Sequence, residues 1–172
     1  ELDFIIAKSK LSQSWNGLRF EPQTKKGIKL KFDKSRHPLL PQNSIPFSIE
    51  IDDSWNVLVI TGPNTGGKTV ALKTIGLLSL MNQSGIQIPA EKGSFLPVFD
   101  GIFSDIGDQQ SIENSVSTFS SHIQNITKIL KFSTQKSLVL LDEIGSSTDP
   151  DEGAAIAMAI LKTLSEQGVL TI

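Results

Sequence analysis

The chain has 172 residues, the size of one domain with a single sizeable core. Its formal net charge of -2, with acids and bases interspersed, excludes the basic footprint of a domain that grips nucleic acid through its own surface. The chain contains no cysteine, which excludes disulfide frameworks and thiolate metal sites and suits a cytoplasmic protein. No apolar stretch approaches the roughly 20 residues of a membrane-spanning helix, so we expect no membrane partner.

The first 51 residues predict a helix end followed by short strands. An apolar cluster followed by serines and lysines predicts that residues 1–16 are the end of a helix arriving from upstream. Prolines and glycines then separate alternating stretches such as Ile28–Phe32, which predicts short antiparallel strands and loops. The lysines between positions 25 and 31 are expected to guard a solvated strand edge, and contact with a phosphate backbone is the alternative. Because the sequence starts without Met and stops inside an apolar run, we expect it to be part of a longer polypeptide.

From residue 55 the pattern changes to apolar strands alternating with helical periodicity, which predicts βαβ units and a mainly parallel sheet. We expect a buried strand over Trp55–Ile60 and a helix from Thr69 to about Asn82. Apolar residues cover most of the circumference of that helix, so it should pack on more than one side. A further helix with one apolar face is expected to start near Ser117.

The last part of the chain predicts one more strand, a helix and a final strand. Leu138–Leu141 is short and wholly apolar, as in a buried strand. The next helix is predicted to have Asp149 as its N-cap, Pro150 in its first position and Glu152 three residues after the cap, as in a capping box. Gly168 is expected to end it. The predicted fold class is therefore α/β, with a mainly parallel sheet flanked by helices and a small antiparallel β portion near the N-terminus.

A glycine-rich motif lies between the predicted strand at 55–60 and the predicted helix from Thr69. It satisfies G-x-x-x-x-G-K-[ST] in the strand–loop–helix context of a phosphate-binding P-loop. Glycines let backbone N–H groups face a phosphate, Lys68 supplies positive charge for the β- and γ-phosphates, and Thr69 offers a hydroxyl to Mg²⁺. A chance glycine-rich turn is the alternative. The predicted nucleotide-binding residues are Gly62, Pro63, Asn64, Thr65, Gly66, Gly67, Lys68, Thr69 and Val70.

Two adjacent acids follow the predicted strand at 138–141, at the end where ligands bind in open α/β sheets. Asp142 is predicted to hold Mg²⁺ with Thr69, and Glu143 to orient or deprotonate the attacking water. Neighbouring side chains alternate along a strand, so the two acids can serve different partners. A strand that merely ends in solvated acids is the alternative. Together with the P-loop, these residues predict an ATPase with Lys68 and Glu143 as catalytic residues and with ATP, ADP and Mg²⁺ as cofactors.

These motifs and the segments between them resemble the MutS family, within the ATP-binding-cassette class of P-loop ATPases, and in particular the second bacterial MutS type. The resemblance covers nearly the whole chain and is carried by Arg36–Leu40, Thr61–Val70, Asp105–Glu113 and Ser117–Phe119. The Asp-Ile-Gly-Asp stretch that begins at Asp105 is the most discriminating. The resemblance implies an ATPase domain over residues 17–172, incomplete on its C-terminal side, after the helix end at 1–16.

The resemblance further implies a homodimer with two composite ATP sites. In these sites, Ser117 and Thr118 of one subunit meet the γ-phosphate held by the P-loop of the other; for Ser117, a simple N-cap is the alternative. Asp108 and Gln109 fall where such ATPases place a loop that senses Mg²⁺ and the attacking water, and a polar surface turn is the alternative. The family's switch His lies beyond the strand that begins at Val169, so this chain alone is expected to hydrolyse ATP weakly.

For the parent protein, the resemblance implies an ATPase that binds branched or mismatched DNA, suppresses homologous recombination and, in some members, rescues ribosomes. DNA contact is expected through parts of the parent protein outside this chain. An ATPase subunit of a membrane transporter is one alternative, although Ser117–Ser121 departs from the Leu-Ser-Gly-Gly-Gln of that class. A nucleotide-dependent assembly scaffold without turnover is the other. Of the two histidines, His37 is expected to shape a turn, and His122 to face solvent or pack rather than to act as a catalyst.

Overall fold

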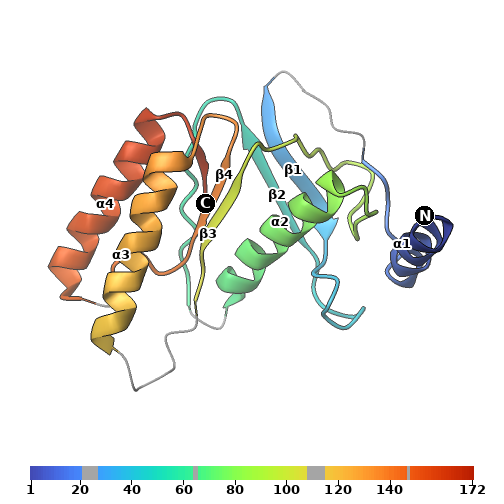
Figure 1. Ribbon diagram of the computed structural model, residues 1–172, viewed down its shortest axis with the longest axis horizontal. Coiled ribbons are helices and arrows are strands. Elements are labelled where there is room, and N and C mark those ends of the chain that lie inside the picture. Colours follow the sequence, from blue (N-terminus) through green and yellow to red (C-terminus); the bar gives the residue numbers. More distant parts are fainter. Residues whose placement is uncertain (21–26, 64–65, 108–114, 147) are drawn as a thin grey trace. The chain divides into compact units, whose positions relative to one another are not determined.

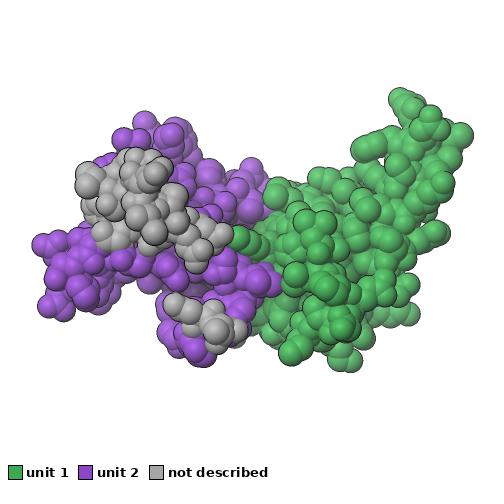
Figure 2. Space-filling view, turned by 90° about the horizontal axis from the view of Figure 1, so that it is seen from below, with its two compact units in different colours: residues 1–55, 73–98 green, residues 56–72, 99–172 purple. Residues whose placement is uncertain are grey.

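The computed structural model describes residues 1–20, 27–63, 66–107, 115–146 and 148–172, with side chains in the fourth segment from Ser120 onward. The chain divides into two compact units, shown in different colours in Figure 2. Unit 1 comprises residues 1–55 and 73–98, and unit 2 comprises residues 56–72 and 99–172. The division at residue 72 falls within helix α2, Lys68–Gln83. None of the helices in the described part of the chain has the length and apolar character needed to cross a membrane.

Unit 1 contains helix α1 (Leu2–Ser14) and the antiparallel strands β1 (Ile28–Ser35) and β2 (Phe47–Asp52). The predicted helix near the N-terminus and the predicted antiparallel strands are both confirmed. Helix α1 exposes several large apolar side chains, and Leu2 and Phe4 are 69% and 66% exposed. Its assignment to the end of an upstream segment stays a prediction.

Alternation along β1 separates its buried face from its polar face. Leu30 and Phe32 are fully buried, and Lys31 between them contacts Glu50, its partner on β2, at 2.6 Å. The hydrogen bond and charge of Glu50 raise the pKa of Lys31 above its ordinary value. Lys29 donates from Nζ to the Trp55 carbonyl oxygen at 2.8 Å. These two lysines therefore bond within the protein, while positions 25 and 26 lie outside the described residues.

Helix α2 starts one residue before its predicted first residue and is buried around most of its circumference, as predicted. Ile75 and Leu78 have no exposed surface, and Ser79 is 1% exposed. The exposed positions form a stripe through Lys73 and Leu80, one heptad apart.

Unit 2 is built on a parallel sheet in the order β3-β4-β5, from strands β3 (Ile102–Asp105), β4 (Leu138–Leu141) and β5 (Leu170–Thr171). The predicted parallel sheet is confirmed, although β3 was not among the predicted strands. Helices α3 (Ser115–Phe132) and α4 (Pro150–Glu166) lie side by side in Figure 1. They pack on one face of the sheet, and the buried core there consists of Ile126, Ile129, Val139, Leu141, Ile160, Leu164 and Val169.

The predicted buried strand at Trp55–Ile60 is wrong in its extent and in its burial. Only Val57 forms a bridge, parallel to Thr171 of β5, and Val59 and Ile60 are 62% and 37% exposed. An apolar run becomes a strand only where a neighbouring strand pairs with it, and β5 pairs with this run at Val57 alone among the described residues.

The N-terminus of α4 is built as its sequence predicts. Asp149 caps it by accepting a hydrogen bond from the backbone N–H of Asp151 at 3.0 Å, and Pro150 takes the first helical position. In the predicted capping box, the Glu152 carboxylate would accept from the backbone N–H of Asp149. It accepts instead from the Thr148 hydroxyl at 3.2 Å. The last helical residue is Glu166 and the C-cap is Gln167. Gly168 follows the cap with a φ of +72° and ends the helix, as predicted.

Candidate nucleotide-binding site

The predicted P-loop lies in unit 2, at the start of α2. The Gly66 N–H donates to the Pro63 carbonyl at 2.9 Å, and the Ala71 N–H to the Gly67 carbonyl at 2.9 Å, so the loop leads directly into the helix. Gly67 has a φ of +77°, a conformation that side-chain-bearing residues rarely adopt. The glycines and Pro63 are exposed, as a loop that receives a ligand must be. Asn64 and Thr65 lie outside the described residues, and Val70 is 43% exposed.

Lys68 folds back over this loop. Its ammonium donates to the carbonyl oxygens of Gly62 at 2.7 Å and of Pro63 at 2.9 Å. The ammonium group therefore lies among the backbone groups of the loop. Rotation of the flexible side chain would let it contact a bound phosphate instead.

The strongest geometric link in the candidate site joins Thr69 and Asp142, which are far apart in the sequence. The Thr69 hydroxyl donates to Asp142 Oδ2 at 2.6 Å, and both side chains are partly buried. Thr69 stands in the first turn of α2, and Asp142 directly follows β4. The fold thus brings together the two oxygen groups that the sequence predicts for Mg²⁺.

This pair fits the ion. Mg²⁺ takes oxygen ligands and is commonly bound by one or two protein groups together with phosphates of the substrate. A hydroxyl and a carboxylate at hydrogen-bond distance, beside a loop with an ammonium group, have that chemistry. Thr69 and Asp142 are the residues that would hold the ion.

Glu143 follows Asp142 at the same edge of the sheet, and its backbone conformation departs from that of a strand. Its φ is +49°, in the left-handed region that is uncommon for residues other than glycine, and such strain clusters at functional sites. The Glu143 carbonyl accepts from the Ser146 N–H at 3.1 Å, which closes a turn. The side chain is exposed. The turn, rather than simple strand alternation, is what separates Glu143 from Asp142.

A close backbone approach supports this turn. Gly145 has a φ of +80°, and a Cβ on Gly153 in the first turns of α4 would collide with the Gly145 carbonyl oxygen. The chain that follows the two acids is therefore pressed against α4, and only glycines allow that approach.

Several residues expected at the site cannot be placed. Ser117 and Thr118 belong to the first turns of α3, which begins two residues before the predicted start, but their side chains lie outside the described residues. Asp108 and Gln109 also lie outside them.

The prediction for His122 missed a polar cluster at the end of β3. His122 Nδ1 lies 2.8 Å from Asp105 Oδ2, and Asn125 Nδ2 donates to Asp105 Oδ1 at 2.8 Å. The His122 side chain is 23% exposed, so it neither faces solvent freely nor packs as an apolar group. The i, i+3 spacing of His122 and Asn125, after an acid that ends a strand, was the available signal.

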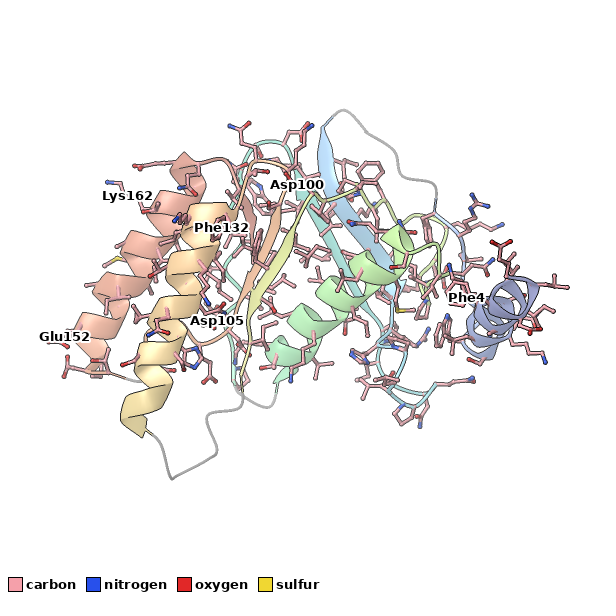
Figure 3. All side chains as sticks on the ribbon, in the orientation of Figure 1. Phe4, Asp100, Asp105, Phe132, Glu152 and Lys162 are labelled. Atoms are coloured by element: carbon pink, nitrogen blue, oxygen red, sulfur yellow. The ribbon has the colours of Figure 1, made fainter. Side chains whose placement is uncertain are left out.

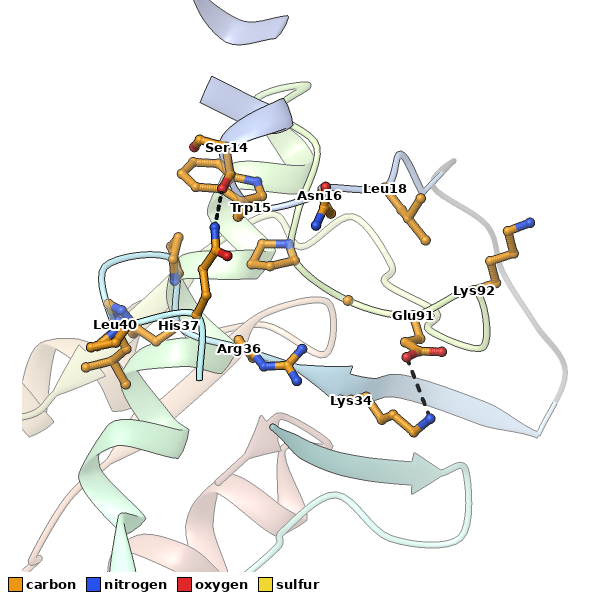
Figure 4. Close-up of a pocket in the computed structure, with 15 residues that line it drawn as sticks. Ser14, Trp15, Asn16, Leu18, Lys34, Arg36, His37, Leu40, Glu91 and Lys92 are labelled. Atoms are coloured by element: carbon orange, nitrogen blue, oxygen red, sulfur yellow. Dashed lines mark hydrogen bonds and ion pairs between the residues drawn. The ribbon is translucent and has the colours of Figure 1, made fainter. Parts of the chain in front are cut away.

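A concavity away from these residues lies within unit 1 (Figure 4). It has a volume of about 720 Å³, and its charged lining residues are Lys34, Arg36, Glu91 and Lys92. Lys34 and Glu91 form an ion pair at 3.6 Å. His37 also lines this concavity. It shapes a turn, as predicted, because its backbone carbonyl accepts from the Leu40 N–H at 3.0 Å. Burial, followed by the charge of Lys73, lowers the pKa of His37.

Comparison with known proteins agrees with this geometry. The family MutS domain V matches residues 58–171, which include the P-loop, Asp142 and Glu143. The chain is 54% identical to "Endonuclease MutS2" of Alkaliphilus oremlandii over 173 residues, covering 100% of the chain and 22% of that protein. It is 54% identical to the protein of the same name from Caldanaerobacter subterraneus subsp. tengcongensis, again over 100% of the chain and 22% of the relative. The match with that from Lactobacillus johnsonii is 53% over 95% of the chain and 21% of the relative.

The chain spans about a fifth of the length of these relatives. The match nevertheless extends over all of its elements, from α1 to β5, so the likeness is not confined to the nucleotide motifs. The chain belongs to the MutS family, as a domain V similar to that of the MutS2 proteins.

Proposed function

We propose that this chain is the ATP-binding and ATP-hydrolysing module of a MutS2-like protein and that it requires Mg²⁺. The observation that carries the proposal is the 2.6 Å hydrogen bond from the Thr69 hydroxyl to Asp142. It joins the P-loop to the acid after β4, and those are the two places from which P-loop ATPases hold the metal.

The described side chains support distinct roles in hydrolysis. Lys68 exchanges the carbonyl oxygens of Gly62 and Pro63 for the β- and γ-phosphates of ATP. Thr69 and Asp142 would hold Mg²⁺, which when bound would neutralise part of the phosphate charge. Glu143, exposed on its strained turn, orients the attacking water and accepts its proton.

We further propose that two copies of the chain complete each other's sites. The support is the resemblance at Ser117–Phe119 and the position of Ser117 and Thr118 in the first turns of α3, where free backbone N–H groups favour an anion. The γ-phosphate bound by the P-loop of one copy is the anion we assign to them.

For the whole protein we propose a cytoplasmic, DNA-acting function. The relatives carry the name "Endonuclease MutS2", and the net charge of -2 favours DNA contact through regions outside this chain. We propose that the whole protein binds branched or mismatched DNA, suppresses recombination and contacts the ribosome. The family match favours this function over that of a transporter subunit.

The test is ATP binding and hydrolysis by the parent protein and two variants. Lys68→Ala should weaken ATP binding, because the triphosphate then faces only backbone dipoles. Glu143→Gln should retain ATP and Mg²⁺ but slow single-turnover hydrolysis by about 10²–10⁴-fold, the usual contribution of a general base. A scaffold without turnover would show no hydrolysis in the parent protein.

Two charge-matched controls lie on α4. Lys162 and Glu166 are 76% and 68% exposed, and Lys162→Ala and Glu166→Gln should behave as the parent protein does. Tight ATP binding by Lys68→Ala would refute the P-loop assignment. Unchanged single-turnover hydrolysis by Glu143→Gln would remove the role of that residue.

A further inference from the structure

Both carboxylate oxygens of Asp105 are held by side chains of α3. Oδ2 lies 2.8 Å from His122 Nδ1, and Oδ1 accepts from Asn125 Nδ2 at 2.8 Å. Asn125 Nδ2 also lies within hydrogen-bond distance of the Ser104 carbonyl oxygen, at 3.1 Å. The side chain of Asp105, labelled in Figure 3, lies between β3 and α3 and is 12% exposed. The end of β3 is thus tied to α3 through one residue.

The main chain of the same residue is tied to the candidate site. The Asp105 carbonyl accepts from the Asp142 N–H at 3.0 Å, directly after the last pair of the ladder, Asp105 with Leu141. Asp142 in turn accepts from Thr69 at 2.6 Å. An unbroken series of hydrogen bonds therefore runs from α3 through Asp105 and Asp142 to the first turn of α2, all within unit 2.

The stripe of α3 that faces the sheet changes character along its length. Ile126 and Ile129 are buried in the core, at 6% and 2% exposure, and hold the later turns of the helix. His122 and Asn125 continue this stripe toward the start of the helix. Apolar packing already attaches α3 to the sheet. Directional hydrogen bonds to a carboxylate add what packing lacks, a fixed angle and height relative to the strand end.

We propose that His122 and Asn125 are positioning residues for ATP hydrolysis. By holding Asp105, they fix the edge from which Asp142 reaches Thr69. They also fix the first turns of α3, where Ser117 lies little more than one helical turn before His122. Neither residue touches the P-loop residues in the described contacts. This inference rests on the proposed ATPase function.

The position of the pair predicts which kinetic constant changes. ATP binding depends on Lys68 and the backbone of the P-loop, so KM for ATP should change little when His122 is replaced. Turnover depends on the placement of the metal-holding pair, so kcat should fall. Loss of one hydrogen bond to a charged group corresponds to a fall of about 10-fold.

The experiment measures kcat and KM for Mg·ATP in the parent protein and in His122→Ala, His122→Asn and Asn125→Ala. Asn places an amide donor where Nδ1 of the histidine stood, so His122→Asn should recover most of the lost kcat. Gln124→Ala is the matched control, because Gln124 is an exposed residue on the same turn of α3 with no bond to Asp105 among the described contacts. Thermal unfolding identifies any variant that is not folded.

A roughly 10-fold lower kcat for the two alanine variants, with KM near the parent value and recovery in His122→Asn, is the expected result. A kcat equal to that of Gln124→Ala overturns the inference, as does a loss that His122→Asn does not repair. Two outcomes separate the proposed function from the positioning role. A parent protein that does not hydrolyse ATP refutes the proposed function. Hydrolysis that responds to Glu143→Gln but not to the variants at His122 and Asn125 refutes only the positioning role.

Discussion

Replacement of Thr69 by Val removes the hydroxyl that donates to Asp142 and keeps the branched shape of the side chain. Without nucleotide, the variant loses a 2.6 Å hydrogen bond to a charged acceptor. Such bonds contribute about 1.5–3 kcal/mol to the free energy of unfolding. Because Thr69 and Asp142 are only partly buried, solvent screening reduces this to about 1 kcal/mol. For a domain of this size, the expected fall in melting temperature is about 2–4 °C.

With nucleotide, Thr69→Val should have a larger effect on activity, because the role proposed for the hydroxyl is then to bind Mg²⁺, which a valine side chain cannot do. The Mg²⁺ concentration that gives half-maximal ATPase activity should rise by about 10-fold or more, as for loss of a hydrogen bond to a charged group. The measurements are thermal unfolding without Mg²⁺ and ATPase rates over a Mg²⁺ titration. Thr69→Ser keeps the hydroxyl and is the control for side-chain shape.

A double-mutant cycle with Asp142→Asn isolates the interaction between the two side chains. Residues in one hydrogen-bond network give non-additive effects on stability, whereas independent sites add to within about 0.5 kcal/mol. Additive losses in the double variant would contradict the hydrogen bond as a source of stability. An unchanged Mg²⁺ dependence in Thr69→Val would contradict its role as a metal ligand.

Two further predictions concern the stability of unit 2. Gly153→Ala should destabilise the protein by about 1–3 kcal/mol, because its Cβ would displace the Gly145 backbone, and an unchanged melting temperature would exclude that close approach. Hydrogen bonds from Thr134, then from Ser137, hold the pKa of Asp100 below its ordinary value of 3.8. Their stabilising effect is full above that value and is lost as the pH falls through the lowered pKa. Asp100→Asn should therefore lose less stability than the parent protein between about pH 6 and pH 3 in urea unfolding; equal losses would dismiss Asp100 as a source of acid sensitivity.

Local patterns predicted most of the helices and the chemical groups of the candidate site. The boundaries of α2 follow from its apolar periodicity, and the start of α4 follows from Asp149 and Pro150. These features depend on neighbours within one or two turns, so a sequence contains all the information they need. The spacing around Lys68 and the position of Asp142 after an apolar strand likewise name the reacting groups, although their roles stay predictions until tested.

Non-local pairing decided the rest. The run at Trp55–Ile60 is as apolar as a strand, yet it forms only a bridge at Val57, because a ladder depends on what the neighbouring strand offers. Glu143 takes its left-handed backbone from the turn pressed against α4, and no local signal in the sequence predicted it.

The contact between Asp105 and His122 joins residues 17 positions apart. It exists because β3 and α3 run past each other in the folded unit. The amino-acid sequence specifies which chemical groups are present and on which elements they lie. Which of these groups meet depends on tertiary packing, because the hydrogen bonds of Thr69 to Asp142 and of His122 to Asp105 need distances that are set by the packing of helices beside the strand ends.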